Sequence, residues 1–108
     1  MPNTYKSIAK KLDVNTTVSA YTVPSATTAI LNLVTFANID ASNSDSIELS
    51  YRKSGDASDT FLNKGATVPT ATTFRFDGPI VLNVGDILKV KAATANRIDV
   101  TIHFLEIT

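Results

Sequence analysis

The sequence predicts an all-β protein, an antiparallel β-sandwich of jelly-roll or immunoglobulin-like shape with an N-terminal arm. Short runs of alternating apolar and polar residues recur about every ten positions, separated by turn residues, as is typical of sandwiches and barrels. The composition agrees, because 15 Thr and 9 Ser occur among 108 residues while Glu occurs twice and Gln is absent. β-Branched residues fit strands, whereas the usual solvent-facing helix formers are scarce. We expect an arm over residues 1–14 and a sandwich domain over residues 15–108.

The first two expected strands cover residues 17–23 and 28–38. The first stops at Pro24, which lacks a backbone N–H donor. The second is the most hydrophobic: strict alternation places Ile30, Val34 and Phe36 on one face. Its other face is apolar as well, with Ala29, Leu31, Leu33 and Ala37. We expect a central strand that also contacts a partner subunit, and Ile30, Val34 and Phe36 are its candidate contact residues.

Polar loops and short strands alternate through the middle of the chain. Residues 47–52 alternate between apolar and polar side chains, which is typical of a strand with one solvated face. We expect loops at residues 40–46 and 54–59, strands at 47–52, 60–63 and 72–76, and a turn at Asp77-Gly78-Pro79.

The C-terminal third predicts a hairpin or corner followed by a long last strand. Apolar segments at residues 80–82 and 87–91 flank a tight turn in which Gly85 can adopt positive φ. In the last strand, residues 97–107, the inward positions are Ile98, Val100, Ile102 and Phe104. Leu105 and Ile107 then occupy the opposite face. Either a bulge near residues 104–106 or burial on both faces explains the change.

The N-terminal residues 5–12 are the one helical candidate, because Tyr5, Ile8 and Leu12 follow i, i+3, i+7 spacing. Two helical turns are marginal in water, so we expect an arm ordered by packing on its own domain or on a neighbour. Three lysines without an acid give residues 1–12 a charge of +3, opposite to the −3 of residues 40–59. Docking of the arm on an acidic loop of another subunit is one hypothesis, and solvated lysines are the alternative. The candidate arm contacts are Tyr5, Lys6, Ile8, Lys10, Lys11 and Leu12.

Composition also removes several classes of function from consideration. The chain has no Cys and a single His, His103, which falls on an outward strand position and is expected to be a surface residue. We therefore expect no catalytic site, no metal and no cofactor. The acidic loops lack calcium-loop spacing, and the four glycines are too far apart to hold phosphates. Zero net charge argues against nucleic acid, and apolar runs of at most three residues argue against a membrane partner and predict a soluble domain.

Four segments in a fixed order resemble small virion proteins of tailed bacteriophages. They are Tyr5-Lys6-Ser7 with Lys10-Lys11-Leu12, residues 21–30, residues 82–90, and residues 99–102 with 105–107. The resemblance covers most of the chain. It implies a β-sandwich that coats the capsid as a decoration or cement protein, or a small part of the tail. The resemblance does not identify any functional residues.

From these observations we expect a non-enzymatic capsid decoration protein that binds the outer capsid surface and stabilises the shell. Its expected location is the virion, its partner the major capsid protein, and its own state a symmetric homo-oligomer such as a trimer. A tail, baseplate or fibre module, contacting tail proteins, is the first alternative. The second is a glycan-binding sandwich that uses Tyr21 or Tyr51 as an exposed platform.

Overall fold

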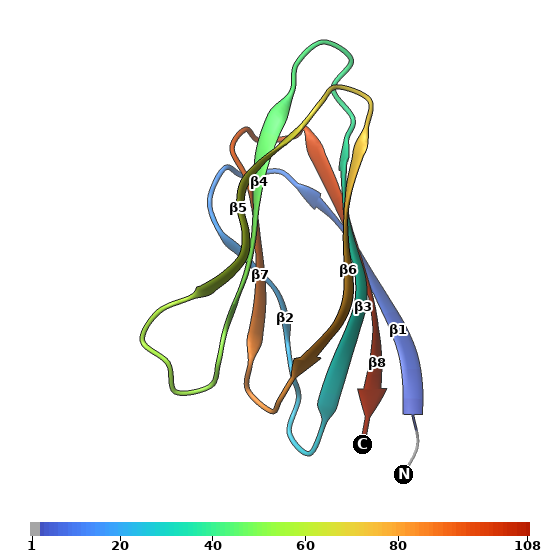
Figure 1. The fold of residues 1–108 in the computed structure, drawn as a ribbon, viewed down its shortest axis with the longest axis vertical. Helices are drawn as coiled ribbons and strands as arrows, with labels where there is room; N and C mark the ends of the chain where they lie inside the picture. The colour runs from blue at the N-terminus through green and yellow to red at the C-terminus, as the bar shows by residue number, and fades with distance from the viewer. Residues whose placement is uncertain (1–2) are drawn as a thin grey trace.

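The computed structural model describes residues 3–108, which form eight β-strands in two antiparallel four-stranded sheets packed together (Figure 1). The expected β-sandwich is confirmed. The strands are β1 (Asn3–Leu12), β2 (Val18–Thr22), β3 (Thr28–Asn38), β4 (Asp45–Arg52), β5 (Thr60–Val68), β6 (Thr73–Leu82), β7 (Ile87–Ala92) and β8 (Ile98–Ile107).

The strand order is that of a jelly roll. One sheet, called sheet A below, has the order β1-β8-β3-β6, and the other, sheet B, has the order β2-β7-β4-β5. Each early strand therefore pairs with a late one: β1 with β8, β2 with β7 and β3 with β6, while β4 and β5 form the closing hairpin. This is the pattern that results when a long antiparallel ribbon rolls into two layers. Asn3, the first described residue, pairs with Ile107, so it lies at the same end of sheet A as the C-terminus (Figure 1).

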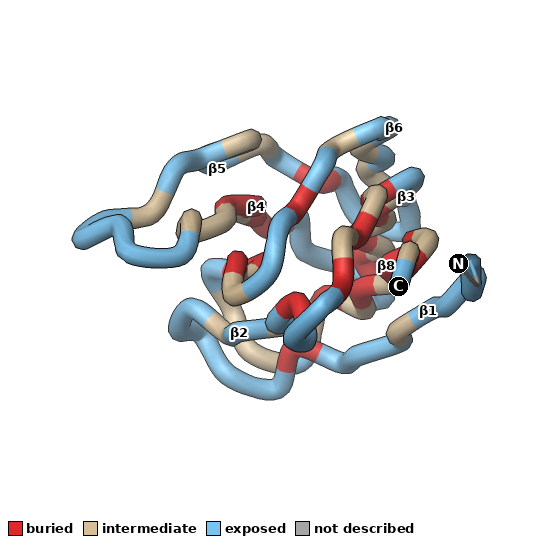
Figure 2. The backbone as a smooth tube through the Cα atoms, turned by 90° about the horizontal axis from the view of Figure 1, so that it is seen from below, coloured by how far each residue is buried: buried red, intermediate tan, exposed pale blue. Residues whose placement is uncertain are grey.

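The core lies between the two sheets and is built from alternate residues of the strands. In β8 the inward side chains Ile98, Val100, Ile102 and Phe104 are buried, as the sequence predicted. Figure 2 shows the same alternation of buried and more exposed positions along β3, whereas β1 is exposed over most of its length. The largest fully buried side chain is Phe36, whose ring centroid is 6.3 Å from that of Phe74.

A bulge in β3 changes which of its residues face the core. The register against both neighbours shifts between Leu31 and Leu33, and Asn32 is the extra, exposed residue. An extra residue reverses the alternation, so Ala29 and Leu31 face inward before the bulge and Val34 and Phe36 face inward after it. The expectation that Ile30 shares a face with Val34 and Phe36 is therefore wrong: Ile30 lies on the outer side of sheet A.

Strand β6 runs through the segment predicted to be a turn. Residues 72–76 and 80–82 were expected to be separate strands, but Asp77, Gly78 and Pro79 belong to one continuous strand, Thr73–Leu82. Gly78 and Pro79 lie opposite the β3 bulge, where the register between β3 and β6 shifts, so the strand continues through them. Gly78 is required here, since a Cβ atom at this position would lie 2.0 Å from the backbone oxygen of Leu31.

We expect Gly78→Ala to lower the free energy of unfolding by about 3 kcal/mol, because the new methyl group would displace β3 backbone. Gly55→Ala is the matched control for the added methyl, since Gly55 has open space around its Cβ position, although its positive φ contributes some strain of its own. Urea denaturation followed by circular dichroism measures both. Equal effects of the two substitutions would contradict the close approach of Gly78 and Leu31.

The last strand keeps its alternation to the end. Leu105 and Ile107 face outward, and the inward position between them is taken by Glu106, which is buried. Of the two explanations offered for Leu105 and Ile107, a bulge near residues 104–106 is absent, because the residues of β8 pair consecutively with β1. The apparent change of face in the sequence arose because a carboxylate, rather than an apolar residue, occupies an inward position.

The helical interpretation of residues 5–12 is wrong, and a separate arm over residues 1–14 is not confirmed. Residues 3–12 form β1, which pairs residue by residue with β8 at the edge of sheet A. Residues four apart share a face in a strand as well as in a helix, so Ile8 and Leu12 both pack on the core, while Tyr5 points to the opposite face. Residues 1 and 2 of the expected arm lie outside the described residues.

Candidate interaction surface

The outer face of sheet A carries an apolar row that crosses all four strands. Tyr5 of β1 lies opposite Leu105 of β8, Leu105 opposite Ile30 of β3, and Ile30 opposite Val81 of β6. Directly opposed residues in antiparallel strands project on the same side, so the four side chains form one continuous line, called the apolar row below. Its two end members are open to solvent: Tyr5 is 79% exposed and Val81 is 54% exposed.

Two ion pairs neutralise the charges on the rest of this face, as far as the structure describes it. Lys11 Nζ of β1 lies 2.9 Å from Asp99 Oδ1 of β8. At the other edge, an Arg75 guanidinium nitrogen lies 3.3 Å from Asp77 Oδ1, both on β6. Small side chains lie between them, including Thr35 and Thr101, whose hydroxyls form a hydrogen bond. The outer face of sheet A is thus apolar at one end and electrically balanced at the other.

The outer face of sheet B has the opposite character, because charged side chains cover it. Asp59 accepts from Arg52 at 2.8 Å and from Lys89 at 3.0 Å, and Lys91 lies 4.0 Å from Glu48. The Lys64 ammonium lies 4.7 Å from the centroid of the Phe61 ring. Four cationic and two acidic side chains give these residues a charge of +2. A charged face remains solvated more readily than an apolar row, so sheet A is the better contact surface.

The edge strands of the described chain are poor sites for adding another strand. β1 carries Lys6, Lys10 and Lys11, and charged side chains oppose edge-to-edge pairing. β6 contains Pro79, which lacks an N–H donor. β5 shifts register twice against β4, and β2 is only five residues long and also irregular. Contact through a sheet face is therefore favoured over contact through an edge.

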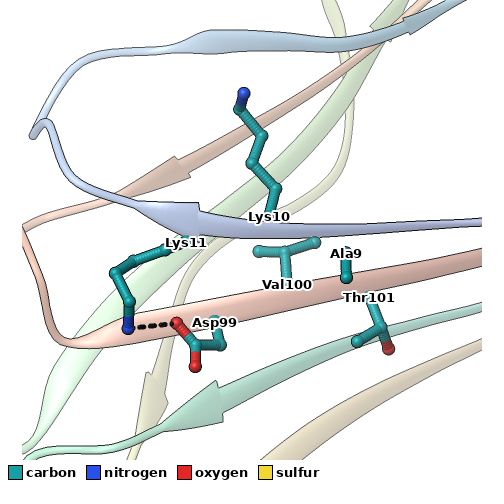
Figure 3. Close-up of a pocket in the computed structure, with 6 residues that line it drawn as sticks. All are labelled: Ala9, Lys10, Lys11, Asp99, Val100 and Thr101. Atoms are coloured by element: carbon teal, nitrogen blue, oxygen red, sulfur yellow. Dashed lines mark hydrogen bonds and ion pairs between the residues drawn. The ribbon is translucent and has the colours of Figure 1, made fainter.

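A shallow hollow of about 280 Å³ lies on sheet A beside β1 and β8 (Figure 3). It is lined by Ala9, Lys10, Lys11, Asp99, Val100 and Thr101. Figure 3 shows the ion pair between Lys11 and Asp99 on one side of the strands and Lys10 extending from the other side. The methyl group of Ala9 leaves the hollow between longer side chains. The charged residues among those that line it are Lys10, Lys11 and Asp99.

The structure separates the sequence-predicted contact residues into three groups. Tyr5 and Ile30 belong to the apolar row. Val34 and Phe36 are 0% exposed and Leu12 is 1% exposed, so these three lie in the core and are inaccessible to a partner, and Ile8 packs against the same core. Lys6 and Lys11 are engaged in ion pairs within the chain, and Lys10 is exposed on β1.

Sequence reasoning missed Leu105 and Val81 as surface residues of one row. The sequence contained a signal for the outward position of Leu105, since this residue departs from the alternation that places Ile102 and Phe104 inward. Val81 had none, because it sits in an apolar run whose flanking residues, Ile80 and Leu82, both face the core. His103 lies where it was expected, exposed on the outer face, and pairs across the strands with Ser7 and Leu33.

Some of the charges in the hypothesis of an arm docked on an acidic loop form ion pairs within the chain. Lys6 Nζ lies 2.8 Å from Glu106 Oε1. Among the acidic residues of the middle, Asp40 pairs with Arg97 at 3.3 Å, and Asp59 holds two cations as described above.

The two tyrosines considered as a glycan platform are half-buried and pack against the core. The Tyr21 ring centroid lies 4.4 Å from that of Phe104, and its hydroxyl donates a hydrogen bond to Glu106. Burial, followed by the neighbouring Glu106 carboxylate, raises the pKa of Tyr21 above its ordinary value. Both rings are therefore partly covered by the protein itself.

A buried carboxylate joins the turn between β6 and β7 to the loop after β4. Asp86 accepts from Lys53 Nζ at 2.6 Å, from the Asn83 amide at 2.8 Å and from the Ser54 amide at 2.9 Å. Burial alone would raise the pKa of Asp86, but these donors outweigh burial and hold its pKa below the ordinary 3.8. Lys6 and then Tyr21 lower the pKa of Glu106 below 4.5 in the same way. Both are structural carboxylates.

These lowered pKa values predict acid sensitivity. A carboxyl whose pKa is lower in the folded than in the unfolded chain stabilises the fold above its ordinary pKa, and this stability is lost as the pH falls. We expect the free energy of unfolding to decrease from about pH 5 downwards, and less steeply in Asp86→Asn. Urea titrations at several pH values measure the slope. An unchanged slope in the variant would show that Asp86 is not a main contributor.

No protein-family model matches this sequence, and comparison with curated proteins and with solved structures likewise gives no match. Within residues 3–108, no helix is long and apolar enough to cross a membrane. Nor do three or more His, Asp or Glu side chains gather within that range in a way that could hold a metal ion.

Proposed function

We propose that this chain is a non-enzymatic structural protein of a bacteriophage virion, most specifically a capsid decoration protein. The observation that carries a role in protein contact is the difference between the two sheet faces: an apolar row crosses sheet A, while ionic side chains cover sheet B. The resemblance of four segments to small virion proteins of tailed phages supports the virion as the place where the contact is made. A jelly roll is compatible with this role, since viral capsid proteins use it, although lectins and cupins do too.

In this role the protein stabilises the shell by adding contacts that are lost only when capsid subunits separate. A specific interface buries at least about 1,000 Å² in total, and symmetry allows several smaller contacts to act together. The outer face of sheet A supplies an apolar contact surface. The buried carboxylates of Asp86 and Glu106, paired with the partly exposed Lys53 and Lys6, hold the turn between β6 and β7 and the edge strand β1 in place.

Mass spectrometry of separated heads and tails tests the proposed location. We expect peptides of this chain in the head fraction, and immunogold labelling of intact particles over the capsid surface. Recovery from tails alone would refute the capsid assignment in favour of the tail alternative. Absence from both fractions would refute a virion role altogether.

A second experiment tests whether the protein stabilises the shell. Particles stripped of the protein are expected to release DNA at a lower temperature, and purified protein added back is expected to restore the higher value. Leu105→Glu, which places a charge in the apolar row, is expected to weaken restoration, whereas Lys91→Glu on sheet B is the matched control. Equal restoration by both variants would show that sheet A does not make the contact.

A further inference from the structure

We propose that the outer face of sheet A binds a second copy of this chain, face to face about a two-fold axis parallel to its strands. The inference rests on the proposed function in taking this face as the contact surface, and it names the occupant as a second copy, so that pairing of copies, and not direct contact of this face with a capsid subunit, links neighbouring positions on the shell. A two-fold axis in this direction places β1 over β6 of the other copy and β8 over β3. Each of the two copies then contributes the same surface to the interface, as two-fold symmetry requires.

The apolar row is complementary to itself under this symmetry. Tyr5 of one copy covers Val81 of the other, and Leu105 covers Ile30. Each contact occurs twice. The most exposed members of the row, Tyr5 and Val81, thus cover each other, and a large ring meets a smaller side chain at both edges.

The charged positions are complementary as well. Arg75 lies in the same cross-strand row as Thr35, Thr101 and Ala9, at the opposite edge of the sheet. The two-fold axis therefore brings Arg75 of one copy over Ala9 of the other, where the 280 Å³ hollow lies with Asp99 among the residues that line it. The Arg75 side chain is 63% exposed and the Asp77 side chain 71% exposed, so Arg75 is accessible, and in this contact it exchanges Asp77 of its own chain for Asp99 of the other.

A guanidinium in the hollow would meet the Asp99 carboxylate, which it would share with Lys11. Asp77 lies in the same cross-strand row as Leu33, His103 and Ser7, so the axis brings it over Ser7 of the other copy. The outer face of sheet B cannot associate with itself in this way, because its excess of cations would repel.

The size of the face also fits a second copy. Four strands spaced by about 4.8 Å, each about 30 Å long, give a face of about 600 Å². Two such faces together remove about 1,200 Å² from solvent, above the roughly 1,000 Å² that a specific interface needs. A second four-stranded face of the same dimensions covers the row, the hollow and both ion pairs at once.

Sedimentation velocity on the purified chain tests the proposal through a charge swap. We expect the wild type to be a dimer. Arg75→Glu and Asp99→Arg are each expected to weaken dimerisation about a hundredfold, counting tenfold for each of two symmetric contacts. The variant that carries both substitutions is expected to dimerise again. Leu105→Glu is expected to be monomeric, and Lys91→Glu to dimerise like the wild type. Circular dichroism checks that every variant is folded.

A wild-type monomer at about 100 μM, a trimer, or failure of the double variant to recover would overturn the two-fold pair. These results differ from failure of the proposed function. If the wild type is monomeric but Leu105→Glu fails to restore stripped particles, the face binds another virion protein and the function stands. If the dimer forms but the chain is missing from particles, the pairing stands and the virion role is refuted.

Discussion

Phe36→Ala is expected to lower the free energy of unfolding by about 3–5 kcal/mol, a large part of the total stability of a domain of this size. Phe36 is the largest fully buried side chain, and its removal leaves a cavity beside Phe74 that rigid strands cannot close. Urea denaturation monitored by circular dichroism measures the loss. The sequence pattern alone places Phe36 and Ile30 on one face and predicts similar effects for both.

Ile30→Ala is the matched control, since it removes an aliphatic side chain from the same strand on the outer side of the bulge. Its expected effect on the isolated monomer is about 1 kcal/mol, because Ile30 is only partly buried there. Losses of equal size for the two variants would contradict the reversal of faces at Asn32.

Removal of residues 1–12 is expected to lower the free energy of unfolding by at least about 5 kcal/mol, enough to unfold many domains. Leu12 is buried in the core, and β1 pairs with β8 along its whole length. Deletion also takes Lys6 from the buried Glu106 carboxylate and leaves the β8 edge exposed. If residues 1–14 were a detachable arm, the shortened chain would keep its stability.

Thermal unfolding of the shortened chain beside Tyr5→Ser distinguishes these two cases. Tyr5 lies on the same strand but is largely exposed in the single chain, so its substitution is expected to change the melting temperature of a dilute, monomeric sample little. A shortened chain with the wild-type melting temperature and a monomeric, soluble state would show that β1 is dispensable.

Most of the fold class could be predicted from the sequence because a strand with one buried face shows alternating apolar and polar residues. Residues 47–52 and 98–104 show this directly. The errors arose where the alternation depends on partners distant in sequence. A bulge leaves no local signature at Asn32, and Glu106 can face inward only because Lys6 and Tyr21 meet it there. Likewise, the β1 pattern of Ile8 and Leu12 fits a strand and a helix equally well.

The candidate surface was only partly predictable for a related reason. Tyr5 and Ile30 were singled out, but as parts of two different surfaces, an arm and a central strand. Their alignment with Leu105 and Val81 follows from the β1-β8-β3-β6 order, which the sequence does not reveal. Val34, Phe36 and Leu12 were chosen as contacts because apolar residues in a strand do not by themselves distinguish a core from an interface.

Hydroxyl-radical footprinting of the assembled protein, compared with a fully exposed peptide standard, tests the contact surface most directly. In the assembled wild type we expect the apolar row, Tyr5, Leu105, Ile30 and Val81, to be protected from labelling. In the Leu105→Glu variant we expect the three unchanged members of the row to become labelled. Phe61 on sheet B is expected to be labelled in the wild type and in the variant. Labelling of the apolar row in the assembled wild type, together with protection of Phe61, would contradict the assignment of sheet A as the contact face.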